Sequence, residues 1–130
     1  MTDKITDMLN RIKNAQAVNH KTVEMPFSKF KFAVAKVLET NGFIGKIEKK
    51  GRKTKKVLEI VLKYNDDKTP AMNGFKKISK PGQRIYQSHT EINRVKSGLG
   101  KAVVSTSKGL LIDDQVRFRK IGGEVLFHIW

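Results

Sequence analysis

Apolar residues near the beginning of the chain recur with the spacing of an α-helix. They stand at positions i, i+3, i+4 and i+7, so they line one side of a helix and leave charged residues on the other sides. The members of this stripe are Ile5, Met8, Leu9 and Ile12. The pattern predicts a helix from about Thr2 to Ala17.

A second helix is predicted after Pro26, which favours extended backbone before it and so ends a short strand at residues 23–25. Ser28 is a residue type that caps helix N-termini, and Asn41-Gly42 provides the left-handed stop at the C-terminus. The buried side of this helix is expected to consist of Phe30, Val34, Val37 and Leu38.

Two strands, at residues 43–49 and 56–63, are predicted around a turn at Gly51. The second strand is rich in branched apolar residues and is too short to form a helix of its own. Residues 1–65 are therefore expected to form an α-β-α-β-β domain. The polar stretch of residues 66–74 has the composition of a linker.

The remaining residues, 75–130, predict a second domain that is mainly β with short helices. Strands are expected at residues 75–78 and 84–86, on either side of a turn at Pro81-Gly82. A closing strand is expected at residues 125–130, after two consecutive glycines.

Short helices are predicted at two places in this second domain. The spacing from Ser88 to Glu91 is that of a capping box, which predicts a short helix ending near Ser97. Residues 102–105 and 109–112 form a hairpin-like pair, and Asp113 is expected to cap one or two helical turns after it. The predicted fold class is α+β, arranged as two small packed domains.

Charge narrows the range of functions. The chain has 27 Lys and Arg residues against 12 Asp and Glu residues, a net charge of +15. A surplus of this size repels itself unless a polyanion is nearby, so nucleic acid is the expected partner of both domains. An anionic membrane normally requires a basic helix with a free apolar face, and the sequence shows none.

Composition also excludes several kinds of site. Cysteine is absent, which rules out disulfides and thiolate metal sites. No apolar run of about 18 residues occurs, and the amino terminus lacks the layout of a secretion signal. We expect a soluble, cytoplasmic protein that is not exported and carries no cofactor.

The densest run of positive charge lies at the tip of the first predicted hairpin. Flexible ammonium groups reach phosphates without a fixed geometry, so such a run supplies affinity and little selectivity. The alternative is a solvated turn that keeps the protein soluble. The run contains Lys46, Lys49, Lys50, Arg52, Lys53, Lys55 and Lys56, opposed only by Glu48.

Three hydroxyls followed by an ammonium group and a glycine stand between two apolar strands, at Ser105-Thr106-Ser107-Lys108-Gly109. Hydroxyls both donate and accept hydrogen bonds, so they can recognise base edges and the 2′-hydroxyl of RNA. The alternative is an ordinary turn, because Ser and Thr also stabilise turns through their own backbone.

Two further side chains are candidates for RNA contact. Tyr86, close to Arg84, offers a ring for stacking on an unpaired base, or it is a half-buried strand aromatic. Glu124 either accepts a hydrogen bond from a base amino group or holds a neighbouring Lys or Ser.

An enzyme is the alternative class, and its best form is a ribonuclease that uses His20, His89 and His128 as general acid and base. No carboxylate lies near these histidines in a recurring catalytic pattern. The glycines do not form a phosphate-cradling loop, and no metal-ligand cluster is present. We expect no catalytic activity.

Three segments make the chain resemble the small-subunit ribosomal protein eight family over essentially its whole length. They are DMLNRIKNA at residues 7–15, ISKPGQRIY at residues 78–86 and GLGKAVVSTSKG at residues 98–109. The ending GGEVL at residues 122–126 is also similar to that of the family.

The resemblance implies two tightly packed α+β domains that bind an irregular helix in the central domain of small-subunit ribosomal RNA early in assembly. It also implies contacts with neighbouring ribosomal proteins. The alternative role is repression of the protein's own operon through a messenger segment that mimics the ribosomal site, or action as an RNA chaperone with the same surface.

Site residues follow from the same resemblance. A loop entering the RNA minor groove would contain Ser105, Thr106, Ser107 and Lys108, with Tyr86 and Glu124 beside it. The RNA backbone would be held from the first domain by Ser28, Lys29, Lys31 and Lys55, and we add Lys53 and Arg84 from the basic segments.

The chain departs from the family pattern in two places. Residues 115–120 carry Gln115, Val116, Phe118 and Lys120 where relatives usually have alanines and a glycine. This difference bears on the length and ending of the short helix there. In the last strand, Phe127 stands where many relatives have cysteine, which is an apolar replacement.

Overall fold

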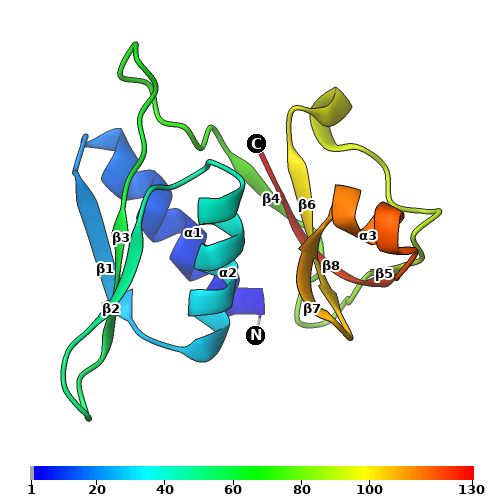
Figure 1. The fold of residues 1–130 in the computed structure, drawn as a ribbon, viewed down its shortest axis with the longest axis horizontal. Helices are drawn as coiled ribbons and strands as arrows, with labels where there is room; N and C mark the ends of the chain where they lie inside the picture. The colour runs from blue at the N-terminus through cyan, green and yellow to red at the C-terminus, as the bar shows by residue number, and fades with distance from the viewer. Residues whose placement is uncertain (1) are drawn as a thin grey trace. The chain divides into compact units, whose positions relative to one another are not determined.

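The computed structural model describes residues 2–130, so Met1 of the predicted first domain lies outside it. The chain forms two compact units, one of residues 4–72 and the other mainly of residues 73–130 (Figure 1). Each contains helices and an antiparallel sheet, which confirms the predicted α+β class.

The unit of residues 4–72 packs two helices against a three-stranded antiparallel sheet of order β1-β3-β2. Leu58 and Ile60 are fully buried in β3, while Val57, Glu59 and Val61, which alternate with them, are more exposed. The alternation gives the sheet one apolar face, and the buried stripes of the helices complete the core. The elements are α1 (Thr2–Ala17), β1 (Thr22–Pro26), α2 (Lys29–Thr40), β2 (Ile47–Lys50) and β3 (Val57–Val61).

Both helices of this unit have bounds close to the sequence prediction, but the buried side of α2 consists of Val34, Ala35 and Leu38, because Phe30 and Val37 are only partly buried. Helix α1 has the predicted bounds and buries the stripe expected of it, including Leu9 and Ile12. Helix α2 begins after Ser28, whose hydroxyl accepts a hydrogen bond from the backbone N–H of Lys31 at 3.1 Å. Its end lies at Gly42, which has the left-handed φ of 81°.

The strand predicted at residues 43–49 is wrong in its first half, because β2 begins only at Ile47. The backbone N–H of Phe43 donates to the carbonyl of Leu38 at 3.0 Å, so this residue still belongs to the end of α2. Phe43 and the following Ile44 are both buried. Two consecutive buried side chains do not fit the alternation of a strand with one exposed face.

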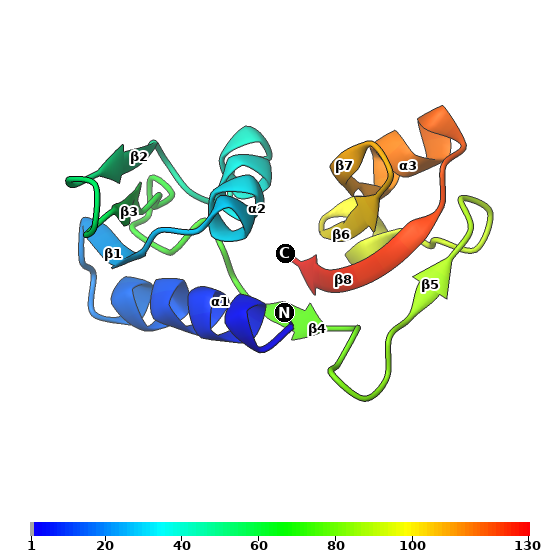
Figure 2. The same ribbon diagram turned by 90° about the horizontal axis from the view of Figure 1, so that it is seen from below.

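The unit of residues 73–130 contains a five-stranded antiparallel sheet of order β4-β8-β6-β7, and β5 also pairs with β8. Figure 2 shows β5 beside the beginning of β8. One face of the sheet and α3 enclose a buried apolar cluster that includes Ala102, Val116 and Val125. The elements are β4 (Phe75–Lys77), β5 (Tyr86–Gln87), the 3₁₀ turn η1 (Val95–Gly98), β6 (Lys101–Thr106), β7 (Gly109–Ile112), α3 (Asp113–Arg119) and β8 (Gly123–Ile129).

The helix predicted from Ser88 to about Ser97 does not form. The backbone N–H of Ser88 does donate to the Glu91 carboxylate at 2.8 Å, but this contact closes an isolated turn. The chain then extends through Arg94, and Lys96 and Ser97 both have positive φ values. This path places Ile92 and Val95 in the apolar cluster, so tertiary packing overrides the local capping signal.

The predicted helix cap at Asp113 is also wrong, because Asp113 is the first residue of α3 and Ile112 precedes it at the cap position. The buried Asp113 carboxylate instead accepts a hydrogen bond from the backbone N–H of Ala102 and pairs with Arg117. Gln115 reaches back to the N–H of Ile112 at 3.1 Å. Helix α3 ends at Lys120, which adopts the left-handed conformation.

Candidate nucleic-acid interface

The hydroxyl-rich loop joins β6 to β7 through a tight turn. Residues pair across these strands as far as Thr106 and Gly109, so only Ser107 and Lys108 lie outside the ladder. The Thr106 hydroxyl donates to the Gly109 carbonyl at 2.8 Å and accepts from the Lys108 N–H at 3.0 Å. Thr106 therefore shapes the turn, while Ser107 and Lys108 are exposed at its tip.

Three candidate residues form a row across neighbouring strands. Glu124 of β8 pairs directly with Tyr86 of β5 on one side and with Ser105 of β6 on the other. Directly opposed residues of antiparallel strands share a face of the sheet, so the three side chains lie on the same face. The Tyr86 side chain is 64% exposed, which leaves its ring available for stacking.

Arg84 also reaches this row, because its guanidinium lies 4.0 Å from a Glu124 carboxylate oxygen. The structural role predicted for Glu124 named Lys or Ser as its partner, whereas the neighbouring cation in the structure is Arg84.

Gly123 brings β8 close to the loop. A Cβ atom at this position would stand 2.2 Å from the Ser105 carbonyl oxygen and 3.1 Å from a Thr106 methyl group. Any side chain would push the two strands apart. The missing side chain therefore sets the distance between Glu124 and the hydroxyl-rich loop.

A second group of candidates lies in the unit of residues 4–72, at the start of α2. The Ser28 hydroxyl is occupied as a helix cap, so its main role in the structure is to begin the helix. Lys29 and Lys31 stand in the first helical turn, where Lys29 is exposed and Lys31 half-buried. Their ammonium groups extend the positive charge of the helix N-terminus.

The basic hairpin tip, residues 51–56, projects from the ends of β2 and β3. Its turn is closed by a hydrogen bond from the Lys55 N–H to the Arg52 carbonyl at 2.9 Å. Gly51 has a φ of 102°, and a Cβ there would meet the Lys55 carbonyl. Lys53 and Lys55 are exposed, and neither forms an ion pair with any carboxylate in residues 2–130.

The structure adds Phe27 and two lysines to this second group. The Lys49 ammonium lies 4.6 Å from the centre of the Phe27 ring, and the backbone N–H of Phe27 donates to the Lys56 carbonyl. The nearby ammonium of Lys56 lowers the pKa of Lys49, with a smaller contribution from Lys29. A shallow hollow of about 570 Å³ runs between Phe27 and residues 53–57.

Sequence reasoning included Lys49 and Lys56 in the basic run but missed Phe27. An aromatic residue directly before a helix cap is a typical hydrophobic staple, and that signal would have marked it as packed against the helix. Its ring does lie 5.9 Å from that of Phe32. Phe118, which is 88% exposed on α3, was noted only as a departure from the family pattern.

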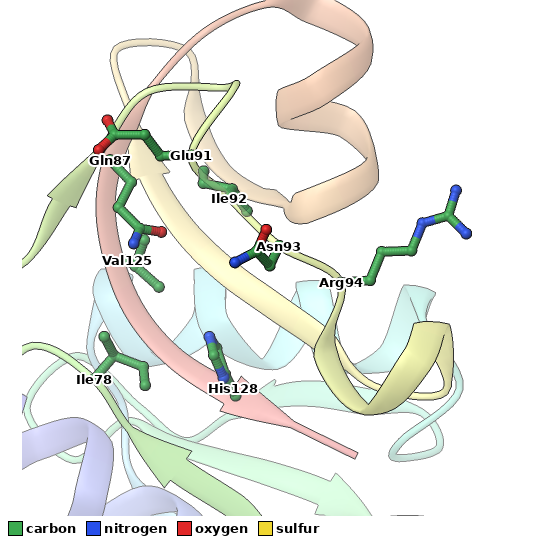
Figure 3. A pocket seen from close by; sticks show the side chains of 8 residues that line it. All are labelled: Ile78, Gln87, Glu91, Ile92, Asn93, Arg94, Val125 and His128. Atoms are coloured by element: carbon green, nitrogen blue, oxygen red, sulfur yellow. The ribbon is translucent and has the colours of Figure 1, made fainter.

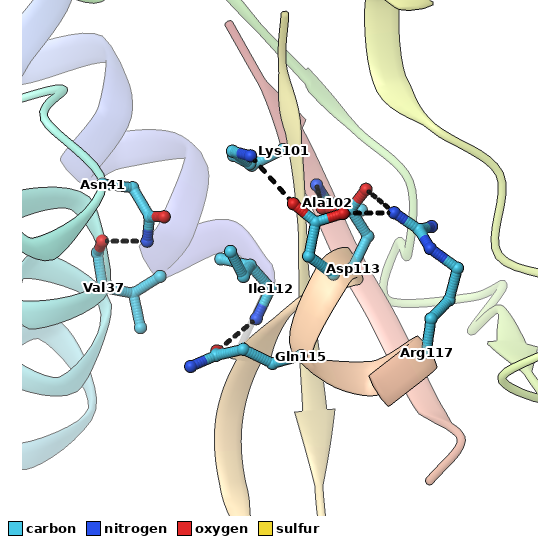
Figure 4. A network of polar contacts seen from close by, with 9 residues as sticks. Val37, Asn41, Lys101, Ala102, Ile112, Asp113, Gln115 and Arg117 are labelled. Atoms are coloured by element: carbon cyan, nitrogen blue, oxygen red, sulfur yellow. Dashed lines mark hydrogen bonds and ion pairs between the residues drawn. The ribbon is translucent and has the colours of Figure 1, made fainter. Parts of the chain in front are cut away.

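An ionic network stabilises the base of the loop-bearing hairpin (Figure 4). The Arg117 guanidinium contacts Asp113 at 2.9 Å and Asp114 at 2.6 Å, and it donates to the Ile92 carbonyl at 3.0 Å. The Lys101 ammonium contacts Asp114 at 3.1 Å. Hydrogen bonds from Lys101 and Arg117 lower the pKa of Asp114. The network holds α3 against β6.

The described residues contain neither a metal-binding cluster nor a membrane-spanning helix. Within residues 2–130, no cluster of three or more His, Cys, Asp or Glu side chains is arranged to hold a metal ion. Among the same residues, no helix has the length and apolar character needed to cross a membrane.

Comparison with known proteins gives a consistent result. A family model described as Ribosomal protein S8 matches residues 3–130. The small ribosomal subunit protein uS8 of Natranaerobius thermophilus is 50% identical over 130 residues, covering 100% of this chain and 98% of that protein. The proteins of the same name from Caldanaerobacter subterraneus and Sorangium cellulosum are 46% and 45% identical, covering 100% of this chain and 98% and 99% of their own lengths.

Proposed function

Because the chain belongs to the ribosomal protein S8 family, the small-subunit ribosomal protein eight of the sequence comparison, we propose that it binds small-subunit ribosomal RNA as a structural component of the ribosome. The site on the RNA is an irregular helix of the central domain, occupied early in assembly. The protein works in the cytoplasm, contacts neighbouring ribosomal proteins and catalyses no reaction.

The observation that carries this proposal is the row of Tyr86, Glu124 and Ser105 across three neighbouring strands. An exposed ring stacks on an unpaired base, a carboxylate accepts from a base amino group, and hydroxyls contact base edges or 2′-hydroxyls. These contacts suit an irregular RNA helix, because its unpaired bases can stack on aromatic rings and expose edges that the deep, narrow major groove of a regular A-form duplex keeps from side chains.

Affinity comes from the basic groups of both units. In the unit of residues 4–72, Lys53 and Lys55 reach phosphates from the hairpin tip, and Lys29 and Lys31 do so from the start of α2. In the other unit, Lys108 lies at the tip of the loop. Such contacts position the protein on RNA without reading its sequence.

Sedimentation of cell extracts at cellular salt concentration tests the proposal. The protein should sediment with the small ribosomal subunit. A protein found free, or with messenger RNA alone, would instead act as a regulator that recognises a mimic of the ribosomal site. Long incubation with RNA should leave the RNA intact, and cleavage abolished by His→Ala substitutions would contradict the absence of catalysis.

A further inference from the structure

A pocket of about 190 Å³ lies in the unit of residues 73–130 (Figure 3). Its apolar floor consists of Ile78, Ile92 and Val125, and polar side chains stand around it. Gln87 lines the pocket, whereas Tyr86 directly before it belongs to the row with Glu124 and Ser105. Successive residues of a strand point to opposite faces, so the pocket is separate from that row.

A bulge in the sheet creates this pocket. Val104 pairs with Val125 and Val103 with Phe127, so β8 contains one extra residue at this point. In a regular strand, residues three apart point to opposite faces. The extra residue places Val125 and His128 on the same face, where both line the pocket.

The polar groups of the pocket suit a neutral ligand with hydrogen-bonding edges. Figure 3 shows Gln87, Asn93 and His128 directed toward the same space. Their side chains make no hydrogen bond within residues 2–130, and each amide both donates and accepts. Partial burial lowers the pKa of His128, helped by the charge of Lys76 and opposed by that of Asp113. A neutral imidazole likewise donates from one nitrogen and accepts at the other.

We propose that this pocket receives an unstacked nucleobase of the bound RNA, as a second recognition site beyond the hydroxyl-rich loop. The inference rests on the proposed function. The space of about 190 Å³ is smaller than the roughly 300–1,000 Å³ of typical ligand pockets. A single heterocycle matches this size, its faces resting on the apolar floor and its edge meeting the amides.

The negative charge of a carboxylate in the pocket favours a neutral base over a phosphate as the group that enters it. The Glu91 carboxylate lines it and is kept ionised by a hydrogen bond from the Ser88 N–H, which lowers the pKa of Glu91. A phosphate would be repelled there. Arg94 points away from the pocket in Figure 3 and is exposed, so it can meet the RNA backbone outside.

The first measurement is an NMR titration of the isotope-labelled full chain with adenosine or uridine 5′-monophosphate. The His128 ring and the Asn93 side-chain amide resonances should shift and saturate. Ribose 5-phosphate, which lacks a base, should leave them unchanged. Equal shifts with ribose 5-phosphate would show recognition of sugar and phosphate, which overturns the proposal.

The second measurement is the affinity for a small-subunit ribosomal RNA fragment of the central domain at one salt concentration. Asn93→Ala and His128→Phe should each raise Kd about five-fold or more, since each removes a hydrogen bond to the base. The matched control is Asn73→Ala, an exposed asparagine of the same unit that lies outside the pocket.

The outcomes of these measurements distinguish failure of the pocket proposal from failure of the proposed function. Wild-type binding with unchanged Kd in both pocket variants would overturn the pocket proposal and leave the proposed function intact. Absence of wild-type binding to any small-subunit ribosomal RNA would overturn both. Weakened binding in the pocket variants, with normal circular dichroism and an unaffected control, supports the nucleobase site.

Discussion

The basic hairpin tip and the hydroxyl-rich loop are both exposed connections between antiparallel strands, but they differ in length and in the side chains that they carry. The tip spans residues 51–56, and the ladder between β2 and β3 ends before it, at Lys50 and Val57. The loop leaves only Ser107 and Lys108 outside its ladder, and Thr106 hydrogen bonds brace the turn.

The difference suggests that the tip contributes affinity for RNA in general and that the loop contributes selectivity between RNAs. In the proposed function, the long side chains of the tip reach phosphates without a fixed geometry, so they are expected to add affinity to every RNA. Short hydroxyls on a braced turn reach only groups at a fixed position, so they contribute to selection. We therefore propose that the two exposed connections serve two purposes, according to whether long charged or short hydroxyl side chains stand on them.

The largest expected effect tests the close approach of β8 to β6 beside the hydroxyl-rich loop. Gly123→Ala places a Cβ against the Ser105 carbonyl at 2.2 Å, so the strands must separate. We expect a loss of about 2–3 kcal/mol in the free energy of unfolding, measured by urea denaturation. Gly82→Ala is the matched control, because nothing lies within 4 Å of its Cβ, and it should change stability by less than about 0.5 kcal/mol. Equal stabilities would contradict the tight approach of β8 to β6.

The next prediction concerns the part of the RNA affinity that does not depend on which RNA is bound. Replacing Lys53 and Lys55 together with Ala should weaken binding to the irregular helix and to a generic duplex alike. If each lysine neutralises one phosphate, the slope of log K against log salt becomes shallower by about 1.4–1.8. Binding measured over a range of salt concentrations gives this slope. An unchanged affinity and slope would show the tip to be only solvated surface.

The smallest effect concerns the pH dependence of stability. Burial lowers the pKa of His128 below its ordinary value of 6.5, so the unfolded chain binds this proton more readily than the folded chain. The stability contributed by neutral His128 is complete above about pH 6.5 and is lost as the pH falls through the lowered pKa. Urea unfolding at pH 7.5 and pH 5 should therefore show a smaller acid loss for His128→Gln than for the wild type. Identical losses would contradict this account.

The sequence predicted elements well where their signals are local. Helix α2 shows this clearly, because Ser28 and Gly42 act on their own backbone and mark its two ends. The capping-box spacing from Ser88 predicted a helix that does not form, because tertiary packing determines the path of the chain there. Its side-chain contact forms, but burial of Ile92 and Val95 requires an extended path that no local pattern reveals.

The candidate site also has parts that the local sequence reveals and parts that only the pairing of distant strands determines. The hydroxyl-rich loop could be predicted from the sequence, because its consecutive Ser and Thr residues stand between two apolar strands. The row of Tyr86, Glu124 and Ser105 depends on strand register, which follows from distant pairing. The pocket beside His128 depends on a bulge in β8, and a single apolar run such as residues 125–127 carries no mark of an extra residue.

The most direct test of the central claim is the ratio of affinities for the irregular central-domain helix and for a generic duplex, measured at one fixed salt concentration. Ser107→Ala should lower this ratio about ten-fold, since an unpaired RNA group costs roughly 1–3 kcal/mol and about 1.4 kcal/mol corresponds to ten-fold. The double Lys53 and Lys55 variant should leave the ratio unchanged. If Ser105→Ala and Ser107→Ala both fold normally by circular dichroism and keep the wild-type ratio, the loop is a structural turn and does not select the RNA.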